Sequence, residues 1–400
     1  MKKSIKLFSL LLTLVLLALS VSAPAYAALT KPVLHFGADG KFRIMHVTDT
    51  HLDDDNAEDT LRLLGMACDR EKPDLVVIGG DNVSTDTRES IKSLTNKLMT
   101  VFNDRSIPVA VTFGNHDSEN GCYTREELMA LYNAFPCSVS VDDGRLLTGC
   151  GTYRLPVYSS KGLSLVFNVW VFDSGDYDDE GHYANVAEDQ VGWYQLESAS
   201  LKLAYGKKIP SVAFQHIIVP EIYEALQKVK MRVPYAYEHL YNKGEYYRFD
   251  PNMTNYGCLH ETPCPGYYNH GQFDAMAESG DVLAVFSGHD HTNAFGVKYK
   301  GVDIVNSLSS RYNGDAFSTQ YGYRMVEIDE NTPSKYTTRV VHWYDFVNMD
   351  GVSSLAKDAS AKRMLTQIRF LGAFQKAGRE IGVIFMRLFG RTVRYADNPT

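Results

Sequence analysis

Short apolar runs alternate with segments of helical periodicity in the first half of the chain. Residues 42–49, 75–81 and 108–117 have the pattern of buried strands, and residues 57–71 and 87–104 between them carry apolar side chains at helical spacing. Strands that alternate with helices in this way form parallel sheets with crossover helices. The pattern therefore predicts an α/β fold that opens with a βαβαβ unit.

The second half adds further predicted strands, interrupted by one long insertion. These strands are residues 163–175, 210–217, 281–291, 294–307, 323–329 and 337–346. Residues 218–280 are rich in Tyr, Pro, Gly and Asn and are far longer than an ordinary connection. Long loops in compact enzymes are usually lids or binding loops, so we expect this insertion to border a cleft.

The end of the chain has a different character. Residues 351–400 form a predicted tail that is helical and basic over 355–394, where nine Lys and Arg face two acidic residues. Apolar positions at near-helical spacing predict one or two amphipathic helices over residues 359–389. Such a helix either packs onto the preceding domain or lies on an anionic membrane surface, and the pattern does not distinguish the two.

The first 27 residues have the organisation of a secretory signal peptide. Three lysines precede an apolar run that ends near Leu19, and the small-residue site Ala25-Tyr26-Ala27 follows it. The apolar run is short for a membrane span of roughly 20 residues. We therefore expect a secreted or cell-envelope protein, with cleavage after Ala27 and a single large domain over residues 28–350.

Composition narrows the function classes further. The formal charge is -8, and removal of the leader makes it more negative, so a general nucleic-acid-binding surface is not expected. Six cysteines are an even number, and disulfides persist in exported proteins. Cys258 and Cys264 lie close together in a turn-rich loop, which predicts a disulfide between them.

Metal-ligand residue types follow five of the predicted strands. They form the clusters Asp49-Thr50-His51, Gly80-Asp81-Asn82, Gly114-Asn115-His116-Asp117, Gln215-His216 and Gly288-His289-Asp290-His291. In open α/β sheets, ligands bind at the carboxyl ends of the strands. Carboxylates and imidazoles in this number, with one carboxylate able to bridge, match the requirements of a pair of divalent cations.

These clusters closely resemble the calcineurin-like metallophosphoesterases. The D-x-H, G-D, G-N-H-[DE], H and G-H-x-H blocks of that family occur here in order, within a match that runs from about residue 42 to 310. Residues 172–177, 212–221 and 280–296 look like the purple-acid-phosphatase-like or Dcr2-like branch. The resemblance implies a four-layer α/β/β/α sandwich of two mixed sheets flanked by helices. It also implies hydrolysis of phosphate mono- or diesters by a metal-bridging hydroxide.

The same resemblance implies roles for individual residues. One divalent metal ion (Mn, Zn or Fe) is expected at Asp49, His51, Asp81 and His291, and a second at Asp81, Asn115, His216 and His289. His116 is expected to protonate the leaving group. Purple acid phosphatases have a tyrosine ligand at the position of Ser84, whereas Ser/Thr phosphatases have an aspartate there that orients the catalytic histidine. The orienting partner of His116 is therefore open, with Asp117 or a loop carboxylate as candidates.

Several residues near the motifs have simpler interpretations. Asp117 and Asp290 are expected to tie loops together rather than bind metal, and His46 is expected to pack in the core. Asp176, Tyr177 and His182 could line the substrate cleft, without an assigned role. The rival for the whole protein is a non-catalytic, metal-stabilised protein that binds envelope polymers or membranes. Loss of a ligand position would favour that rival, and every position is filled.

Overall fold

Two mixed β-sheets form the centre of the molecule in the computed structural model, which describes residues 31–142, 147–162, 164–233, 235–250, 255–312 and 321–388. The five-stranded sheet has the order β16-β15-β2-β3-β4. Its strands are β2 (Lys41–Val47), β3 (Leu75–Gly79), β4 (Val109–Thr112), β15 (Gly322–Asp329) and β16 (Tyr336–His342). β2, β3 and β4 are parallel, as the βαβαβ pattern predicts, whereas β15 pairs antiparallel to β2.

The eight-stranded sheet has the order β1-β5-β6-β7-β12-β14-β13-β11. Its strands are β1 (Leu34–His35), β5 (Tyr153–Tyr158), β6 (Leu165–Val171), β7 (Ser211–Phe214), β11 (Asn255–Cys258), β12 (Val282–Ser287), β13 (Ala294–Tyr299) and β14 (Val302–Asn306). β6, β7, β12 and β14 run parallel. The chain therefore sends the carboxyl ends of β7 and β12 to one edge of this sheet.

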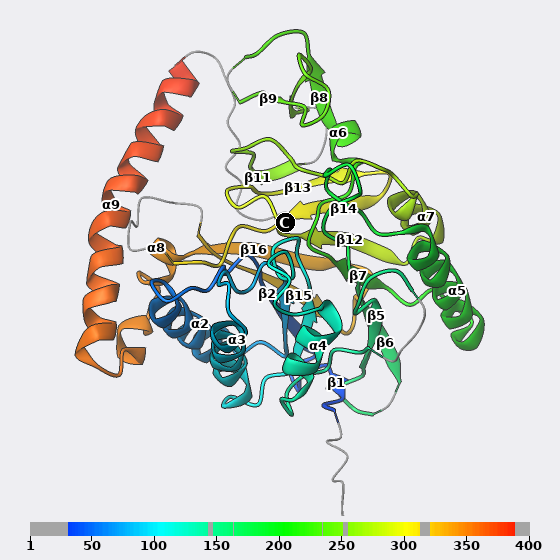
Figure 1. Ribbon diagram of the computed structural model, residues 1–400, viewed down its shortest axis with the longest axis horizontal. Coiled ribbons are helices and arrows are strands. Elements are labelled where there is room, and N and C mark those ends of the chain that lie inside the picture. Colours follow the sequence, from blue (N-terminus) through cyan, green and yellow to red (C-terminus); the bar gives the residue numbers. More distant parts are fainter. Residues whose placement is uncertain are drawn as a thin grey trace, which may run out of the picture.

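The two sheets pack face to face with helices outside them (Figure 1). A core of apolar side chains from both sheets, including Phe42, Val77, Phe214 and Phe286, is buried between them. Outside the five-stranded sheet lie α2 (Ala57–Glu71), α3 (Arg88–Asn103) and α4 (Arg125–Asn133). Outside the eight-stranded sheet lie α5 (Glu188–Tyr205), α6 (Ile222–Ala225) and α7 (Gln272–Ser279). This is the expected four-layer α/β/β/α sandwich.

Local sequence signals explain where these helices begin and end. α2 ends at Glu71, and the next residue, Lys72, adopts a left-handed conformation with φ 49° and precedes Pro73, a residue that cannot continue a helix. α4 begins with a capping box, in which the Thr124 side chain accepts from the Glu127 N–H and Glu127 accepts from the Thr124 N–H. Both boundaries position the loops that precede and follow the parallel strands.

Two predictions about the second half of the chain are wrong. Residues 294–307 form a hairpin of β13 and β14 rather than one strand, because Lys300 and Gly301 both take positive φ and turn the chain back. Cys258 and Cys264 are not joined by a disulfide. Cys258 ends β11 opposite Ala294 of β13, whereas the Cys264 N–H donates to Asp290, so different neighbours hold the two residues.

The insertion over residues 218–280 is a folded element and not an irregular loop. It contributes a three-stranded sheet of β8 (Leu226–Val229), β9 (Tyr237–Glu238) and β10 (Tyr246–Phe249), in the order β8-β10-β9. Figure 1 shows this small sheet beyond the β11 edge of the eight-stranded sheet. The insertion thus extends the molecule beyond the β11 side of the eight-stranded sheet.

α8 (Trp343–Phe346) precedes the predicted tail, which contains the 3₁₀-helix η1 (Val352–Leu355) and one long helix, α9 (Ala359–Leu388). Buried side chains of its first turns, such as Leu365 and Ile368, join the apolar core that α2 and α8 share. Phe370 and Phe374 are exposed. Within the described residues, no helix is long and apolar enough to cross a membrane. The predicted signal peptide lies outside the described residues.

Candidate metal centre

The five predicted clusters meet between the carboxyl ends of the two sheets. Loops after β2, β3 and β4 approach from one sheet, and loops after β7 and β12 approach from the other. Four residues of these loops, Asp49, His51, Asp81 and His289, have positive φ between 39° and 70°. Side chains other than glycine adopt this region at a cost, and such strain gathers at functional sites.

The first group of ligand-type residues consists of Asp49, His51, Asp81 and His291, whose donor atoms all lie within 4.8 Å of one another. The Nε2 atoms of His51 and His291 are 3.0 Å apart. His291 Nε2 is 3.5 Å from Asp49 Oδ1, and His51 Nε2 is 3.8 Å from Asp81 Oδ2. Two imidazole nitrogens and two carboxylate oxygens therefore face one small volume.

The second group shares Asp81 with the first and adds His216 and His289, again within 4.8 Å. His216 Nε2 lies 3.2 Å from Asp81 Oδ2 and 3.9 Å from Asp49 Oδ1. The other ring nitrogen of His216 lies 2.8 Å from the Gly79 carbonyl oxygen and donates to it, which leaves Nε2 as the nitrogen that would bind a metal ion. Asp81 belongs to both groups, as a bridging carboxylate must.

Buried polar atoms without hydrogen-bond partners mark the space between these residues. They include Asp81 Oδ2, Asn115 Oδ1, His216 Nε2 and His289 Nε2. Buried polar groups are almost always paired, and an unpaired one is costly. Four ligand-type atoms in one place, without hydrogen-bond partners other than one another, fit a pair of divalent cations, because cations would satisfy all of them at once. The donor set of carboxylates, imidazoles and one amide oxygen is also that of a dinuclear site.

Electrostatics at the site favour ligand-competent forms of several side chains. Burial lowers the pKa of His51 to about 4, so its imidazole is neutral and able to bind metal. Burial opposes ionisation of Asp81, but the neighbouring His216 and His51 lower the pKa of its carboxyl below the usual range. Burial by itself would lower the pKa of the His216 imidazole. The neighbouring Asp81 and Asp49 carboxylates have the larger effect and raise that pKa above its usual value. A bound cation would replace His216 as the positive partner of these carboxylates.

Glycine residues in the motifs are required by close approach. A Cβ atom on Gly114 would lie 2.1 Å from Asp81 Oδ1. A Cβ atom on Gly288 would lie 2.1 Å from Thr48 Oγ1 and 2.5 Å from Asp49 Oδ2. Both contacts are far inside van der Waals distance, so these two positions admit no side chain without displacing the carboxylates.

His116 lies beside both groups but belongs to neither. Its backbone N–H donates to Asp81 Oδ1 at 2.8 Å, and its ring lies 5.6 Å from that of His51. Its Nδ1 is 2.7 Å from Glu119 Oε2, and its side chain is 38% exposed. The sequence left two candidates for the partner of His116, Asp117 or a loop carboxylate, and the carboxylate that contacts its ring is Glu119. Asp117 does not take that role.

The remaining predicted residues take structural positions. Asp117 is buried and accepts hydrogen bonds from the N–H groups of Asp81, Asn82 and Gly114, so it ties two loops together as expected. Asp290 accepts from the Cys264 N–H and the Asn293 amide, and burial raises its pKa to about 8. His46 is fully buried in the core, as expected.

Sequence reasoning missed three supporting contacts, each made across long sequence separations. Ser84 Oγ lies 2.8 Å from His51 Nδ1, so the residue at the tyrosine position of purple acid phosphatases supports a ligand-type histidine instead. Asn115 Nδ2 donates to the Tyr177 hydroxyl at 2.8 Å. Tyr183 meets the ring of His289 edge-on at 4.3 Å. Of these three contacts, only those of Tyr177 and Tyr183 had a local sequence signal, the pairs Asp176-Tyr177 and His182-Tyr183.

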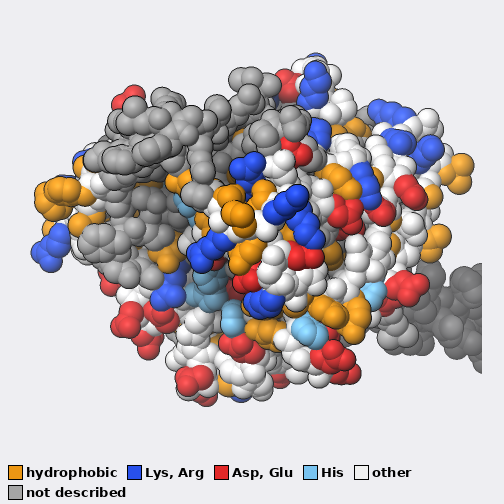
Figure 2. Space-filling view, turned by 90° about the horizontal axis from the view of Figure 1, so that it is seen from above, with side chains coloured by type: hydrophobic (Ala, Val, Ile, Leu, Met, Phe, Trp, Pro, Cys, Tyr) orange, Lys and Arg blue, Asp and Glu red, His pale blue; other side chains and the backbone are white. Residues whose placement is uncertain are grey.

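Two histidines of the centre are partly exposed to solvent. His116 and His291 are the most accessible residues of the centre, with side chains 38% and 42% exposed. Figure 2, which looks onto the molecule from above, shows histidine side chains at the surface beside acidic and basic ones. The His116 and His291 side of the centre is therefore in contact with solvent.

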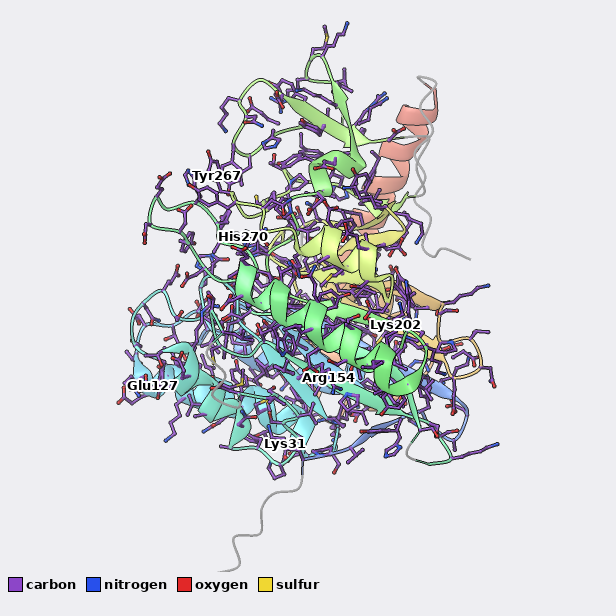
Figure 3. The ribbon with its side chains drawn as sticks, turned by 90° about the vertical axis from the view of Figure 1, so that its right-hand side faces the viewer. Lys31, Glu127, Arg154, Lys202, Tyr267 and His270 are labelled. Atoms are coloured by element: carbon purple, nitrogen blue, oxygen red, sulfur yellow. The ribbon has the colours of Figure 1, made fainter. Side chains whose placement is uncertain are left out.

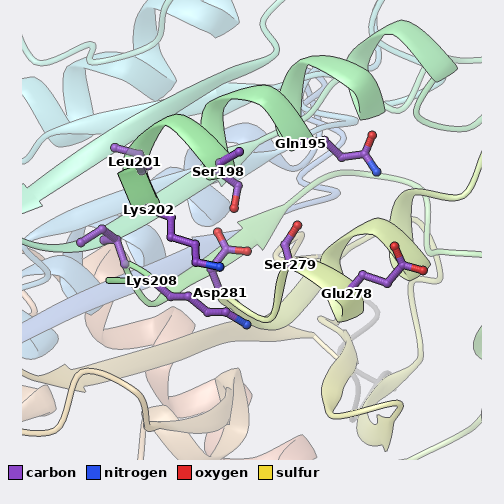
Figure 4. A pocket seen from close by; sticks show the side chains of 10 residues that line it. Gln195, Ser198, Leu201, Lys202, Lys208, Glu278, Ser279 and Asp281 are labelled. Carbon is purple, nitrogen blue, oxygen red and sulfur yellow. The ribbon is translucent and has the colours of Figure 1, made fainter. Parts of the chain in front are cut away.

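A separate cavity of about 190 Å³ lies between α5 and α7, as Figure 4 shows. Lys202, Lys208 and Asp281 are among its lining residues. Asp281 is buried, and its Oδ1 accepts from the Tyr194 hydroxyl at 2.6 Å. Asp281 precedes β12 and His289 follows it, so this cavity and the ligand-type residues lie at opposite ends of one strand. It is not part of the metal centre.

Comparison with known proteins agrees with this geometry. The family described as calcineurin-like phosphoesterase matches residues 42–293. "Probable inactive purple acid phosphatase 29" from Arabidopsis thaliana is 28% identical over 372 residues, which cover 82% of this chain and 86% of that protein. "Phosphatase DCR2" from Saccharomyces cerevisiae is 27% identical over 312 residues, 68% of this chain and 50% of that protein.

A solved dimetal phosphatase from Danio rerio is 15% identical to this chain, with a TM-score of 0.45. The superposition covers 75% of this chain and 95% of that protein. The family match includes the blocks from Asp49 to His291, whose side chains converge on one centre. The family match and the meeting of these side chains at one centre therefore indicate the same family. The chain belongs to the calcineurin-like phosphoesterases.

Proposed function

We propose that this protein is an active, exported phosphoesterase that hydrolyses phosphate mono- or diesters with two divalent metal ions. The observation that carries the proposal is the set of buried ligand atoms without partners, from Asp81, Asn115, His216 and His289. Such costly unpaired groups favour a protein that binds metal ions, and His116 beside them favours catalysis over metal binding alone.

Asp49, His51, Asp81 and His291 would hold one ion, and Asp81, Asn115, His216 and His289 the other. Two bound cations supply an acidified water as nucleophile and neutralise charge on the phosphate oxygens. Among the side chains of the protein, His116 would supply the proton that the leaving group needs. Glu119 faces Nδ1 of its ring, which leaves Nε2 to donate a proton to the leaving oxygen.

Location is part of the proposal. Export rests on the signal-peptide pattern of residues 1–27. Contact with an anionic membrane surface through the basic tail is proposed on the exposed Phe370 and Phe374 of α9. Amino-terminal sequencing of the protein from a fractionated culture tests export: a chain that begins at Met1 and stays in the cytoplasm refutes it.

One observation favours the rival function of a non-catalytic metal-stabilised protein. The Arabidopsis relative described above is named as probably inactive. The two functions differ in turnover and agree in metal binding. We therefore expect hydrolysis of aryl phosphate mono- or diesters by full-length mature protein with Mn²⁺ or Zn²⁺, and its loss with chelator. Two bound ions without turnover of any ester would favour the rival.

A further inference from the structure

Asn115 is held by one end of its side-chain amide. Its Nδ2 donates to the Tyr177 hydroxyl at 2.8 Å, while its Oδ1 is buried without a hydrogen-bond partner. A carboxamide has a donating and an accepting end, and divalent cations take only the oxygen. The bond from Nδ2 to Tyr177 therefore selects the orientation in which the oxygen faces the metal centre.

Tyr177 is itself well placed to fix another side chain. It sits on a short hairpin, in which Tyr177 and Tyr183 form an antiparallel bridge and the Ala184 N–H donates to the Asp176 carbonyl. The rings of Tyr177 and Tyr183 stack with centroids 5.6 Å apart. Because both backbone and ring are held, the hydroxyl has a defined position.

The hairpin is braced on both sides. Tyr183 meets the His289 ring at 4.3 Å, so the same hairpin touches both Asn115 and His289. On the other side, the Tyr267 N–H donates to the Tyr183 carbonyl at 2.9 Å, and the Tyr267 ring stacks on His182 at 4.2 Å. Tyr267, labelled in Figure 3, belongs to the long insertion. The insertion thereby supports the metal centre through this hairpin.

We propose that Tyr177 is a positioning residue of the second metal site: its hydroxyl holds the Asn115 carboxamide with Oδ1 toward the cation. This inference rests on the proposed function, because it requires that the second ion binds. Tyr177 lies 62 residues from Asn115. It ends the stretch 172–177 that resembles the Dcr2-like branch, and it lies outside the five clusters of ligand-type residues. Groups that orient metal ligands are typically worth 10- to 100-fold in metal affinity.

The test is a calorimetric titration of the metal-free full-length protein with Mn²⁺. The wild type is expected to bind two ions. Tyr177→Phe keeps the ring stack and removes the hydroxyl, so one of the two affinities should fall by roughly 10- to 100-fold while the other stays unchanged. Tyr268→Phe is the matched control, because Tyr268 lies near the same hairpin and is 51% exposed, and should match the wild type.

A double-mutant cycle separates positioning from a general structural effect. In an Asn115→Ala background there is no amide to orient, so adding Tyr177→Phe should not weaken Mn²⁺ binding further. Melting temperatures of the metal-free variants should agree with that of the wild type. Unchanged affinities in Tyr177→Phe, or a full additional loss in the double variant, would overturn the inference. A wild type that binds no second ion would instead contradict the proposed function.

Discussion

His116 Nδ1 lies 2.7 Å from the Glu119 carboxylate, three residues further along the same loop. Superfamily relatives with an aspartate at the position of Ser84 would orient the histidine from another loop. Here Ser84 contacts His51 instead, at 2.8 Å. The proposed acid His116 and its carboxylate partner are thus close in sequence, whereas Ser84 and His51 come from different loops.

Replacing Glu119 with Gln should lower kcat by roughly 10-fold, less than the 10²- to 10⁴-fold worth of the acid itself. The reason is that the amide still fills the space but no longer favours the imidazolium. KM and metal content should change little, since Glu119 belongs to neither ligand group. Steady-state kinetics on an alkyl ester provide the measurement, and a kcat equal to that of the wild type would contradict the role.

His116→Asn should reduce turnover by roughly 10² to 10⁴ and leave about two metal ions per chain. Esters with acidic phenol leaving groups need little protonation and should suffer less than alkyl esters. His289→Asn is the contrast, because it removes a ligand-type nitrogen and should lower metal content and activity together. The metal content and the kinetics of both variants are the measurements. Equal loss of metal in both variants would mean that His116 is a metal ligand.

Removal of metal should destabilise the fold. Without cations, the buried atoms of Asp81, His216 and His289 stay unpaired, whereas bound cations satisfy them. A ligand present at 100 times its Kd stabilises the native state by about 2.7 kcal/mol. Calorimetric melting with Mn²⁺ and then with excess chelator should show a higher Tm with metal. His289→Asn should show a smaller difference, and an identical Tm in both conditions for the wild type would exclude a metal-stabilised site.

Iron-loaded protein should lack a strong visible absorption band. A tyrosinate ligand produces the colour of purple acid phosphatases, and Ser84 occupies its position here, within 2.8 Å of His51 Nδ1. The absorption spectrum of iron-reconstituted protein is the measurement, and Ser84→Tyr is an informative companion variant. A purple wild-type sample would show that another tyrosine reaches the metal.

The first turns of α9 should contribute to the stability of the domain. Leu365 is 2% exposed and lies in the core shared with α2 and α8, so Leu365→Ala should cost about 2–5 kcal/mol in the free energy of unfolding. Phe374 is 66% exposed, and Phe374→Ala should change stability little. Denaturant unfolding measures both. Equal stabilities would mean that α9 does not pack as described.

The membrane proposal is tested with the same pair of variants. Sedimentation with anionic vesicles should be weaker for Phe374→Ala and for removal of residues 369–400 than for Leu365→Ala. Association that is unchanged by removing these residues would refute membrane contact through the tail.

Part of the candidate site was predictable from local patterns. Asp49, Asp81 and Asn115 each follow an apolar strand of the βαβαβ unit, and the carboxyl ends of parallel neighbours must share one edge. His216 and His289 follow strands of a different sheet, whose meeting with the first depends on how the two sheets pack. The family resemblance supplied that relationship, because periodicity describes one element at a time.

The sequence by itself determined the α/β class, the helices over residues 57–71 and 87–104, the ligand inventory and the family, since each depends on short-range spacing. Tertiary structure decided which side chains support the ligands. Glu119 beside His116, Ser84 beside His51 and Tyr177 beside Asn115 arise from loop geometry and from contacts across up to 62 residues. It also decided that Cys258 and Cys264 form no disulfide: Cys258 pairs with Ala294 of β13, whereas the Cys264 N–H donates to Asp290.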